Sequence, residues 1–371
     1  MKINTIVVLM LSAVTTAVMS VASLNANAAG WNTCNGNNIT WDNTVENLSA
    51  GKKSFPPGSA MAAALQTAVD RLNANPSKFY FTLSLSDTTI NLNNGENEVW
   101  FSKDPAVLSG APAITLTWSH CYEFAGLHYG IDETDVIFDV NQNYTTSMNK
   151  ANLNSFGGSS RPFQTTAIHE LGHAMGLNHE NRWYNIMGDD WNHIHVNGST
   201  ARSYLGEDAS EGSIILYGAT SANIEDLSLS NFKYLGTSGQ YSTHQPTQLF
   251  DSANSVLSSY NDSGERRYYV NKGQAVKLEL TGENNGKATH TVKIAYYVST
   301  NSTISTSDKL IGTGTVTLKR NQPATFKTSL VIPSDLIAGT NYWLGAIVDY
   351  DDALVETVSS NNATYLPIRV N

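Results

Sequence analysis

The stretch from His169 to His179, HELGHAMGLNH, constrains this chain more than any other part of its sequence. Residues four apart in a helix lie on the same face, so His169 and His173 would direct their imidazoles toward one metal ion. Glu170 would lie beside that face, where its carboxylate can reach a water on the metal. A helix commonly ends at a glycine, so Gly176 would turn the chain and bring His179 in as the third ligand. Three protein ligands leave one position open, as catalytic zinc sites do.

A methionine follows this stretch in a tight segment, Asn185-Ile186-Met187-Gly188. The His-Glu-x-x-His pattern alone arises by chance, but the added glycine and third histidine at fixed offsets make chance a poor explanation. Together these residues resemble the zinc-binding signature of the metzincin metallopeptidases. The resemblance implies one catalytic zinc ion and a protein or peptide substrate. It also implies that Met187 is the Met-turn methionine, which packs beneath the metal without binding it.

The activity implied is that of a zinc metalloendopeptidase, in which a zinc-activated water attacks the peptide bond and Glu170 is the general base. Some metzincins place a tyrosine ligand two residues after the methionine, but Asp189 stands there, so no tyrosine ligand is expected. The chain past the Met-turn lines the specificity pocket in this family, which makes Trp191 a candidate pocket residue. His193 and His195 could form a second metal site, but a solvent-facing strand with alternating side chains is the preferred interpretation.

The first 28 residues have the pattern of a Sec-type signal peptide. Lys2 precedes an apolar run, and Ala26-Asn27-Ala28 forms a small-residue cleavage site. A membrane anchor is the alternative, but the run is short and rich in small residues. No later stretch is long and apolar enough to span a bilayer, so no transmembrane segment is expected in the mature chain. The sequence therefore predicts a secreted, extracellular protein of bacterial type that begins at Ala29.

The charge and the cysteines agree with export. A formal net charge of −10 without a basic patch argues against nucleic acid as a partner. Two cysteines, Cys34 and Cys121, form an even pair that predicts one disulfide bond in an oxidising compartment. The alternative is that Cys34 is an inhibitory zinc ligand, as in some related zymogens. Too few residues precede it to form a pro-domain, and its neighbours do not resemble the switch motif.

The region from residue 29 to 220 is predicted to be the catalytic domain, of α+β class, with a mixed twisted sheet and two long helices. A helix capped by Ser59 should run to about Asn73, and Pro162 should open the active-site helix. Strands are expected at Ile39–Trp41, Phe79–Leu85, Asn97–Ser102, Ala113–Ser119 and Asp135–Val140. This order, with a closing helix at 206–218, resembles the matrixin branch of the metzincins.

The matrixin resemblance carries two further implications. By position, Ala113–Ser119 would be the edge strand that binds an extended substrate. Matrixins often bind calcium as well, so a calcium ion is a candidate second cofactor. Asp132, Asp135 and Asp139 are available carboxylates, but their spacing is not that of a calcium motif.

Residues 225–371 change character and are predicted to form an antiparallel β-sandwich. Strands are expected at Gln274–Leu280, Thr291–Val298, Thr313–Lys319, Ala324–Ile332 and Asn341–Asp349. Pieces such as 296–300 and 339–343 resemble a bacterial cell-adhesion-related, immunoglobulin-like domain, and 239–263 reads as an insertion rich in Ser, Gln and Asn.

Such a domain would bind a surface or glycan, target the substrate, or serve as a spacer. Two other functions compete with the endopeptidase: an adhesin and a zinc amidase acting on cell-wall peptides. The intact Glu170 argues against a pure adhesin, because binding alone needs no base beside the metal.

Overall fold

The structure, a computed structural model, describes residues 6–8 and 29–371. The predicted signal peptide at 1–28 therefore lies outside the described residues, apart from the short strand β1 (Ile6–Val8). Among the described helices, none is long and apolar enough to cross a membrane.

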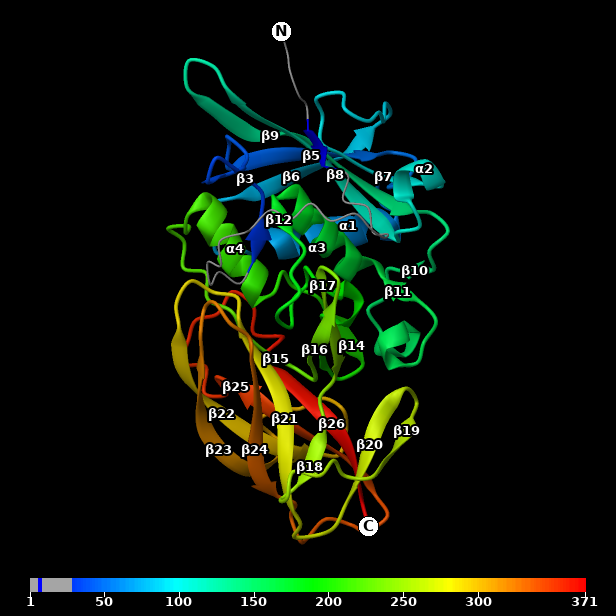
Figure 1. Cartoon of the computed structure of the whole chain (residues 1–371). Coiled ribbons are helices and arrows are strands. Elements are labelled where there is room, and N and C mark those ends of the chain that lie inside the picture. The colour runs from blue at the N-terminus through cyan, green and yellow to red at the C-terminus, as the bar shows by residue number, and fades with distance from the viewer. Residues whose placement is uncertain (1–5, 9–28) are drawn as a thin grey trace.

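A mixed sheet forms one layer of the N-terminal half (Figure 1). In sheet order its strands are β1, β8 (Ala113–Glu123), β9 (Leu127–Asp139), β7 (Glu98–Ser102), β5 (Val45–Gly51) and β6 (Tyr80–Asp87). The pairs β5–β6, β5–β7 and β7–β9 are parallel, whereas β8–β9 is antiparallel. The predicted mixed sheet is present.

Helices cover the lower face of this sheet in the view of Figure 1. They are α1 (Ala60–Asn73), α3 (Phe163–Ala174) and α4 (Glu207–Tyr217), while α2 (Pro105–Leu108) is a single turn. The predicted cap is present, because Ser59 Oγ accepts from the Ala62 amide at 3.1 Å. One buried cluster joins these helices to the sheet and includes Leu65, Val136 and Leu171. The packing of α3 against this core fixes the position of its polar face.

Local strand prediction failed at the start of the sheet. Ile39–Trp41 is irregular, and the first long strand is β5, which the sequence analysis did not predict. The segment near Trp41 is held by isolated hydrogen bonds instead. Trp41 Nε1 donates to the Ala174 carbonyl at 2.9 Å, and the Ile131 amide donates to the Thr40 carbonyl at 2.9 Å. Smaller elements complete this half: β2 (Gly30–Trp31), β3 (Thr33–Cys34), β4 (Asn37–Asn38), β10 (Tyr144–Thr145), β11 (Arg161–Pro162), β12 (Leu177–Asn178), β13 (His195–Asn197), β14 (Thr200–Arg202) and 3₁₀ turns at Lys150–Asn152, Asn154–Phe156 and Asp190–Asn192.

Two large sheets form the sandwich of the C-terminal half and share a buried core that includes Leu278, Tyr296 and Ile368. The first sheet contains β15 (Leu227–Ser230), β21 (Ala275–Asn284), β18 (Leu249–Asp251) and β24 (Ala324–Val331). The second contains β19 (Ser259–Asp262), β20 (Glu265–Val270), β26 (Ala363–Val370), β25 (Asn341–Val348), β22 (His290–Ser299) and β23 (Lys309–Leu318). This is a sandwich, but not a wholly antiparallel one, because β20 and β26 pair in parallel.

A further buried cluster draws side chains from both halves. Tyr184, Ile194 and Val196 from the N-terminal half pack with Tyr297 and Tyr365 from the C-terminal half. The predicted domains, 29–220 and 225–371, therefore meet across a shared apolar core. Side chains that bury one another in this way disfavour independent movement of the two parts.

The two cysteines form the Cys34–Cys121 disulfide bond, with an S–S distance of 2.04 Å. The bond ties the N-terminal segment to the β8–β9 hairpin across a sequence separation of 87 residues. It leaves no free cysteine in the described residues and so excludes Cys34 as a zinc ligand in this state.

Replacing both cysteines by serine should lower the free energy of unfolding by about 2–5 kcal/mol, because the unfolded chain regains the entropy of a long loop. Guanidinium denaturation of wild type and the double variant would measure the difference. Equal midpoints and slopes for the two proteins would contradict the expectation.

Candidate metal centre and cleft

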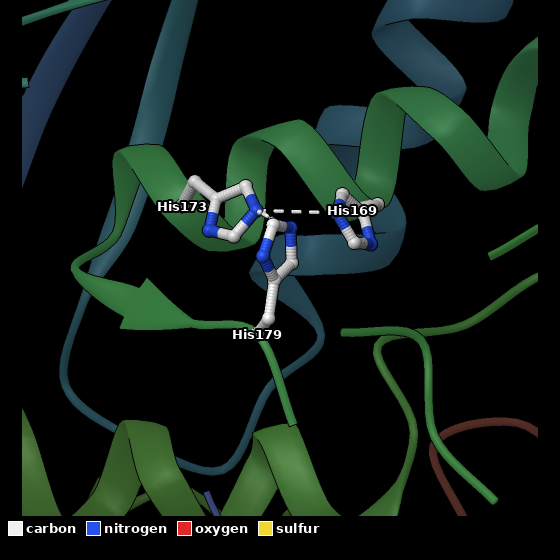
Figure 2. Close-up of side chains that lie close together, drawn as sticks. All are labelled: His169, His173 and His179. Atoms are coloured by element: carbon white, nitrogen blue, oxygen red, sulfur yellow. Dashed lines mark hydrogen bonds between the residues drawn. The ribbon is translucent and has the colours of Figure 1, made fainter. Parts of the chain in front are cut away.

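Three histidines converge at the end of α3 (Figure 2). His169 and His173 project from the same face of the helix, and His179 reaches back from the segment after β12. His173 Nε2 lies 3.1 Å from His169 Nε2 and 2.9 Å from His179 Nε2. Gly176 adopts a positive φ of 107°, which an L side chain would rarely tolerate, at the point where the chain reverses. The spacing that the sequence analysis singled out therefore does bring the three imidazoles together.

Backbone carbonyls orient two of these rings. His169 Nδ1 donates to the Ile186 carbonyl at 2.6 Å, and His173 Nδ1 donates to the Leu177 carbonyl at 2.7 Å. Each bond places the ring proton on Nδ1 and leaves the Nε2 lone pair facing the centre of the cluster. Burial, with the neighbouring His169, lowers the pKa of His173 to about 3, so this ring is neutral at physiological pH. Neutral imidazoles with converging Nε2 atoms are the donor set that fits a zinc ion.

Glu170 lies next to this cluster, and Thr115 holds its carboxylate. Thr115 Oγ1 is 2.7 Å from Glu170 Oε2 and 2.9 Å from the Glu170 carbonyl. Burial raises the pKa of Glu170 above its usual value. Thr115 was expected in the strand at 113–119, but its contact with Glu170 was not predicted, because the two residues are 55 positions apart in the chain.

Met187 packs beneath the helix between the first two histidines. A Cβ added to Gly172 would lie 2.5 Å from Met187 Sδ, so the thioether occupies the space that a side chain would need. Met187 is 1% exposed and belongs to the buried core cluster. The segment that carries Met187 thus supports the histidine cluster in two ways. Met187 packs against the helix at Gly172, and the Ile186 carbonyl orients the His169 ring. Gly172 was not predicted as a site residue, although a glycine inside a helix is a packing signal.

A cleft opens in front of the histidines. Its walls are the start of β8, the histidine helix, the segment after Met187 and part of the C-terminal half; they include 111–115, Arg161, Glu170, 188–191, Ser238 and 241–243. Trp191 lines the cleft as expected, with the Arg161 guanidinium 5.6 Å from its ring centroid. Arg161 also pairs with Asp190, whose other carboxylate oxygen accepts from Thr166 Oγ1 at 2.6 Å.

The C-terminal half supplies a wall that the sequence analysis missed. The strands β16 (Phe232–Ser238) and β17 (Tyr241–Pro246) form a hairpin that rises toward α3 in Figure 1. The Tyr241 ring lies 4.1 Å, centroid to centroid, from the His179 ring. The stretch 239–263, described as an insertion, therefore begins with the turn and the second strand of this hairpin. Gly239, with φ of 61° in a two-residue turn, was an available hairpin signal, but nothing local shows where a hairpin docks.

Backbone bonds fix this hairpin to both sides of the Met187 segment. The Ser242 amide donates to the Glu180 carbonyl at 2.8 Å, and the Asp189 amide donates to the Ser242 carbonyl at 2.9 Å. A Cβ on Gly188 would lie 1.7 Å from Ser242 Oγ, so this close approach requires glycine. The hairpin is thus part of the cleft rather than a loop that touches it.

Two other predictions do not hold in the form stated. His193 and His195 are 0% and 1% exposed, so they do not alternate on a solvent-facing strand. Asp132, Asp135 and Asp139 do not gather: the first contacts His120 at 2.8 Å, and the others belong to no common group of potential ligands among the described residues. Calcium binding by these three carboxylates is not supported.

The predicted edge strand is also only partly open. Within the described residues, β1 pairs with β8 at Thr117–Ser119 and leaves the positions toward Ala113 without a partner on that side. Because β1 belongs to the predicted signal peptide, this pairing would be absent from the mature chain expected from Ala29. Residues 111–115, which line the cleft, lie at this open end.

Two buried imidazoles and a partly buried third lie beside a buried carboxylate in an open cleft, as in a centre of the metallopeptidase type. A sequence model of the matrixin family matches residues 120–218, which contain the three histidines, Glu170 and Met187. The match supports a matrixin-like metallopeptidase, and zinc is the metal that the family implies. No curated protein matches the chain.

Solved structures similar to this chain include a CARDB domain from Pyrococcus furiosus, in complex with di-metal ions, with 16% identity, a TM-score of 0.25, and coverage of 41% of this chain and 97% of that one. A putative cell surface protein domain from Methanosarcina acetivorans has 20% identity and a TM-score of 0.21, covering 27% and 78%. A beta-glucosidase from Listeria innocua has 12% identity and a TM-score of 0.21, covering 41% and 18%.

Thr115→Val should lower kcat roughly 10- to 100-fold, because Glu170 loses the bond that positions its carboxylate. Zinc content should not change, since both hydrogen bonds of the Thr115 hydroxyl go to Glu170. Peptide hydrolysis and metal analysis would be measured together, with Thr115→Ser as the control that keeps the hydroxyl. A valine variant as active as the serine variant would show that the bond is dispensable.

Tyr241→Ala should lower kcat/KM roughly 10-fold and broaden selectivity, because the cleft loses an aromatic wall against His179. Tyr241→Phe keeps the ring and should stay within about two-fold of wild type. Both variants would be profiled on one peptide library. Identical profiles for the alanine variant and wild type would remove Tyr241 from the substrate site.

Proposed function

We propose that this protein is an exported zinc endopeptidase. The observation that carries the proposal is the convergence of His169, His173 and His179 next to Glu170 in an open cleft. The matrixin match over the same residues supports it. The disulfide bond is compatible with an oxidising compartment outside the cytoplasm, as the signal-peptide pattern predicts.

The three histidines would hold the zinc ion through their Nε2 atoms. A bound zinc ion polarises a carbonyl oxygen and lowers the pKa of a bound water toward about 7. Glu170 is the base that takes the proton from the attacking water and returns it to the leaving amine. Its carboxylate can do so because Thr115 fixes one oxygen, Oε2, and burial raises its proton affinity.

The substrate would bind as an extended peptide along the open end of β8. Residues 111–115 line the cleft, and their outer backbone groups have no strand partner among the described residues. Trp191 would contact a substrate side chain from one side and Tyr241 from the other. Through Tyr241, the C-terminal half would help to shape the cleft that binds the substrate. Its role would then not be limited to attachment to a surface.

Glu170→Gln in the chain from Ala29 should retain zinc and lose roughly 10²- to 10⁴-fold in peptide hydrolysis, because the amide cannot accept the proton. The assay is a quenched-peptide and casein library, with phenanthroline and then zinc added back to wild type. Cleavage should disappear with the chelator and return with zinc. A glutamine variant that cuts at the wild-type rate would exclude Glu170 as the base, and cleavage only of cell-wall peptides would favour the amidase.

A further inference from the structure

A second cluster of metal-binding side chains lies where the two halves meet. His193 and His195 come from the segment after Met187, and Glu283 comes from β21 of the C-terminal half. His193 Nε2 lies 3.0 Å from Glu283 Oε1, and His195 Nε2 lies 3.2 Å from Glu283 Oε2. All three side chains are at most 1% exposed. They are separate from the histidines of the cleft.

The orientation of His195 is that of a metal ligand. Its Nδ1 donates to the Leu229 carbonyl at 3.0 Å, so the ring proton is accounted for and the Nε2 lone pair faces Glu283. Neither His195 Nε2 nor Glu283 Oε2 has a hydrogen-bond partner, although the two atoms face each other. Two buried acceptors at this distance repel unless a proton or a cation lies between them.

Two further carboxyl groups, those of Glu207 and Asp208, lie near the cluster, and burial raises the pKa of each well above its usual value. The Arg182 guanidinium acts against this rise at Asp208. Glu207 and Asp208, at the start of α4, are fully buried, and no oxygen of either carboxylate has a hydrogen-bond partner. The Glu207 amide contacts Glu283 Oε1 at 3.4 Å, which places the start of α4 against the cluster. Buried carboxylates are paired or bound to metal in stable proteins, because an unpaired charge in the interior is costly.

We propose that His193, His195 and Glu283 bind a second divalent metal ion, of the zinc class. Two imidazoles and one carboxylate are a zinc donor set, and Glu207 is a candidate fourth ligand. The site is closed to solvent, so the ion would be structural. It would join the segment that follows Met187 to the sandwich. The ion would thereby fix the position of that segment relative to the part of the cleft wall that the C-terminal half supplies. The proposal does not depend on peptidase activity.

The experiment counts metal ions in a protein whose cleft site has been disabled. His169→Ala/His173→Ala removes two cleft ligands and leaves the second cluster untouched. After gel filtration in metal-free buffer, this variant should retain about one zinc per chain by mass spectrometry, against about two for wild type. X-ray absorption at the zinc edge should show nitrogen and oxygen ligands in that single site.

Adding Glu283→Gln to the double variant should remove the remaining zinc and abolish the visible absorption of a Co²⁺-titrated sample. The matched control is Glu279→Gln in the same background, since Glu279 is also a buried carboxylate on β21 but pairs with Lys233 at 2.7 Å. That control should keep its metal.

A folded double variant that binds neither zinc nor Co²⁺ would overturn the proposal and leave a protonated histidine paired with Glu283. Retention of the metal after Glu283→Gln would also overturn it. If the Glu283 variant does not fold, the metal count and the absorption spectrum of the double variant decide the question alone.

Discussion

The cleft depends on holding the Nε2 atoms of His169 and His179 at 3.1 Å and 2.9 Å from that of His173. Their lone pairs repel one another without a cation, so the arrangement has to be imposed by the surrounding chain. Two backbone carbonyls, from Ile186 and Leu177, do this by taking the ring protons of His169 and His173. Packing of α3 on the sheet and of Met187 under Gly172 fixes those carbonyls in turn. The core of the N-terminal half is therefore what places the donor atoms.

Local signals in the sequence predicted the parts of this site that are close together in the chain. Helical spacing places His169 and His173 on one face, and Gly176 turns the chain toward His179, as the sequence analysis expected. Distant contacts could not be found in this way. Thr115 contacts Glu170 across 55 residues, and the hairpin tip at Tyr241 meets His179 from another domain. Neither contact can be predicted from the local pattern of apolar and polar residues.

The errors have the same origin. His193 and His195 alternate with Ile194 as residues of an exposed strand would, yet Glu283 and the sandwich bury both of them. The stretch 239–263 is polar apart from β18, whose Leu249 and Phe250 are buried, and it also contains β17 and β19, which pair with β16 and β20. The β20–β26 pair is parallel, which alternation of polar and apolar residues cannot reveal. A pattern of polar residues normally predicts an exposed segment, but here the second domain buries such residues.

The docking of Ser242 against Gly188 has a consequence for the order of events during synthesis. A ribosome makes the histidine helix and its carboxylate about seventy residues before the hairpin that closes the cleft, by the numbering of Glu170 and Ser242. A nascent chain that has not yet reached that hairpin has the chemical groups but lacks the wall that the hairpin supplies. The cleft is thus completed late in biogenesis, when the sandwich folds against the part made first.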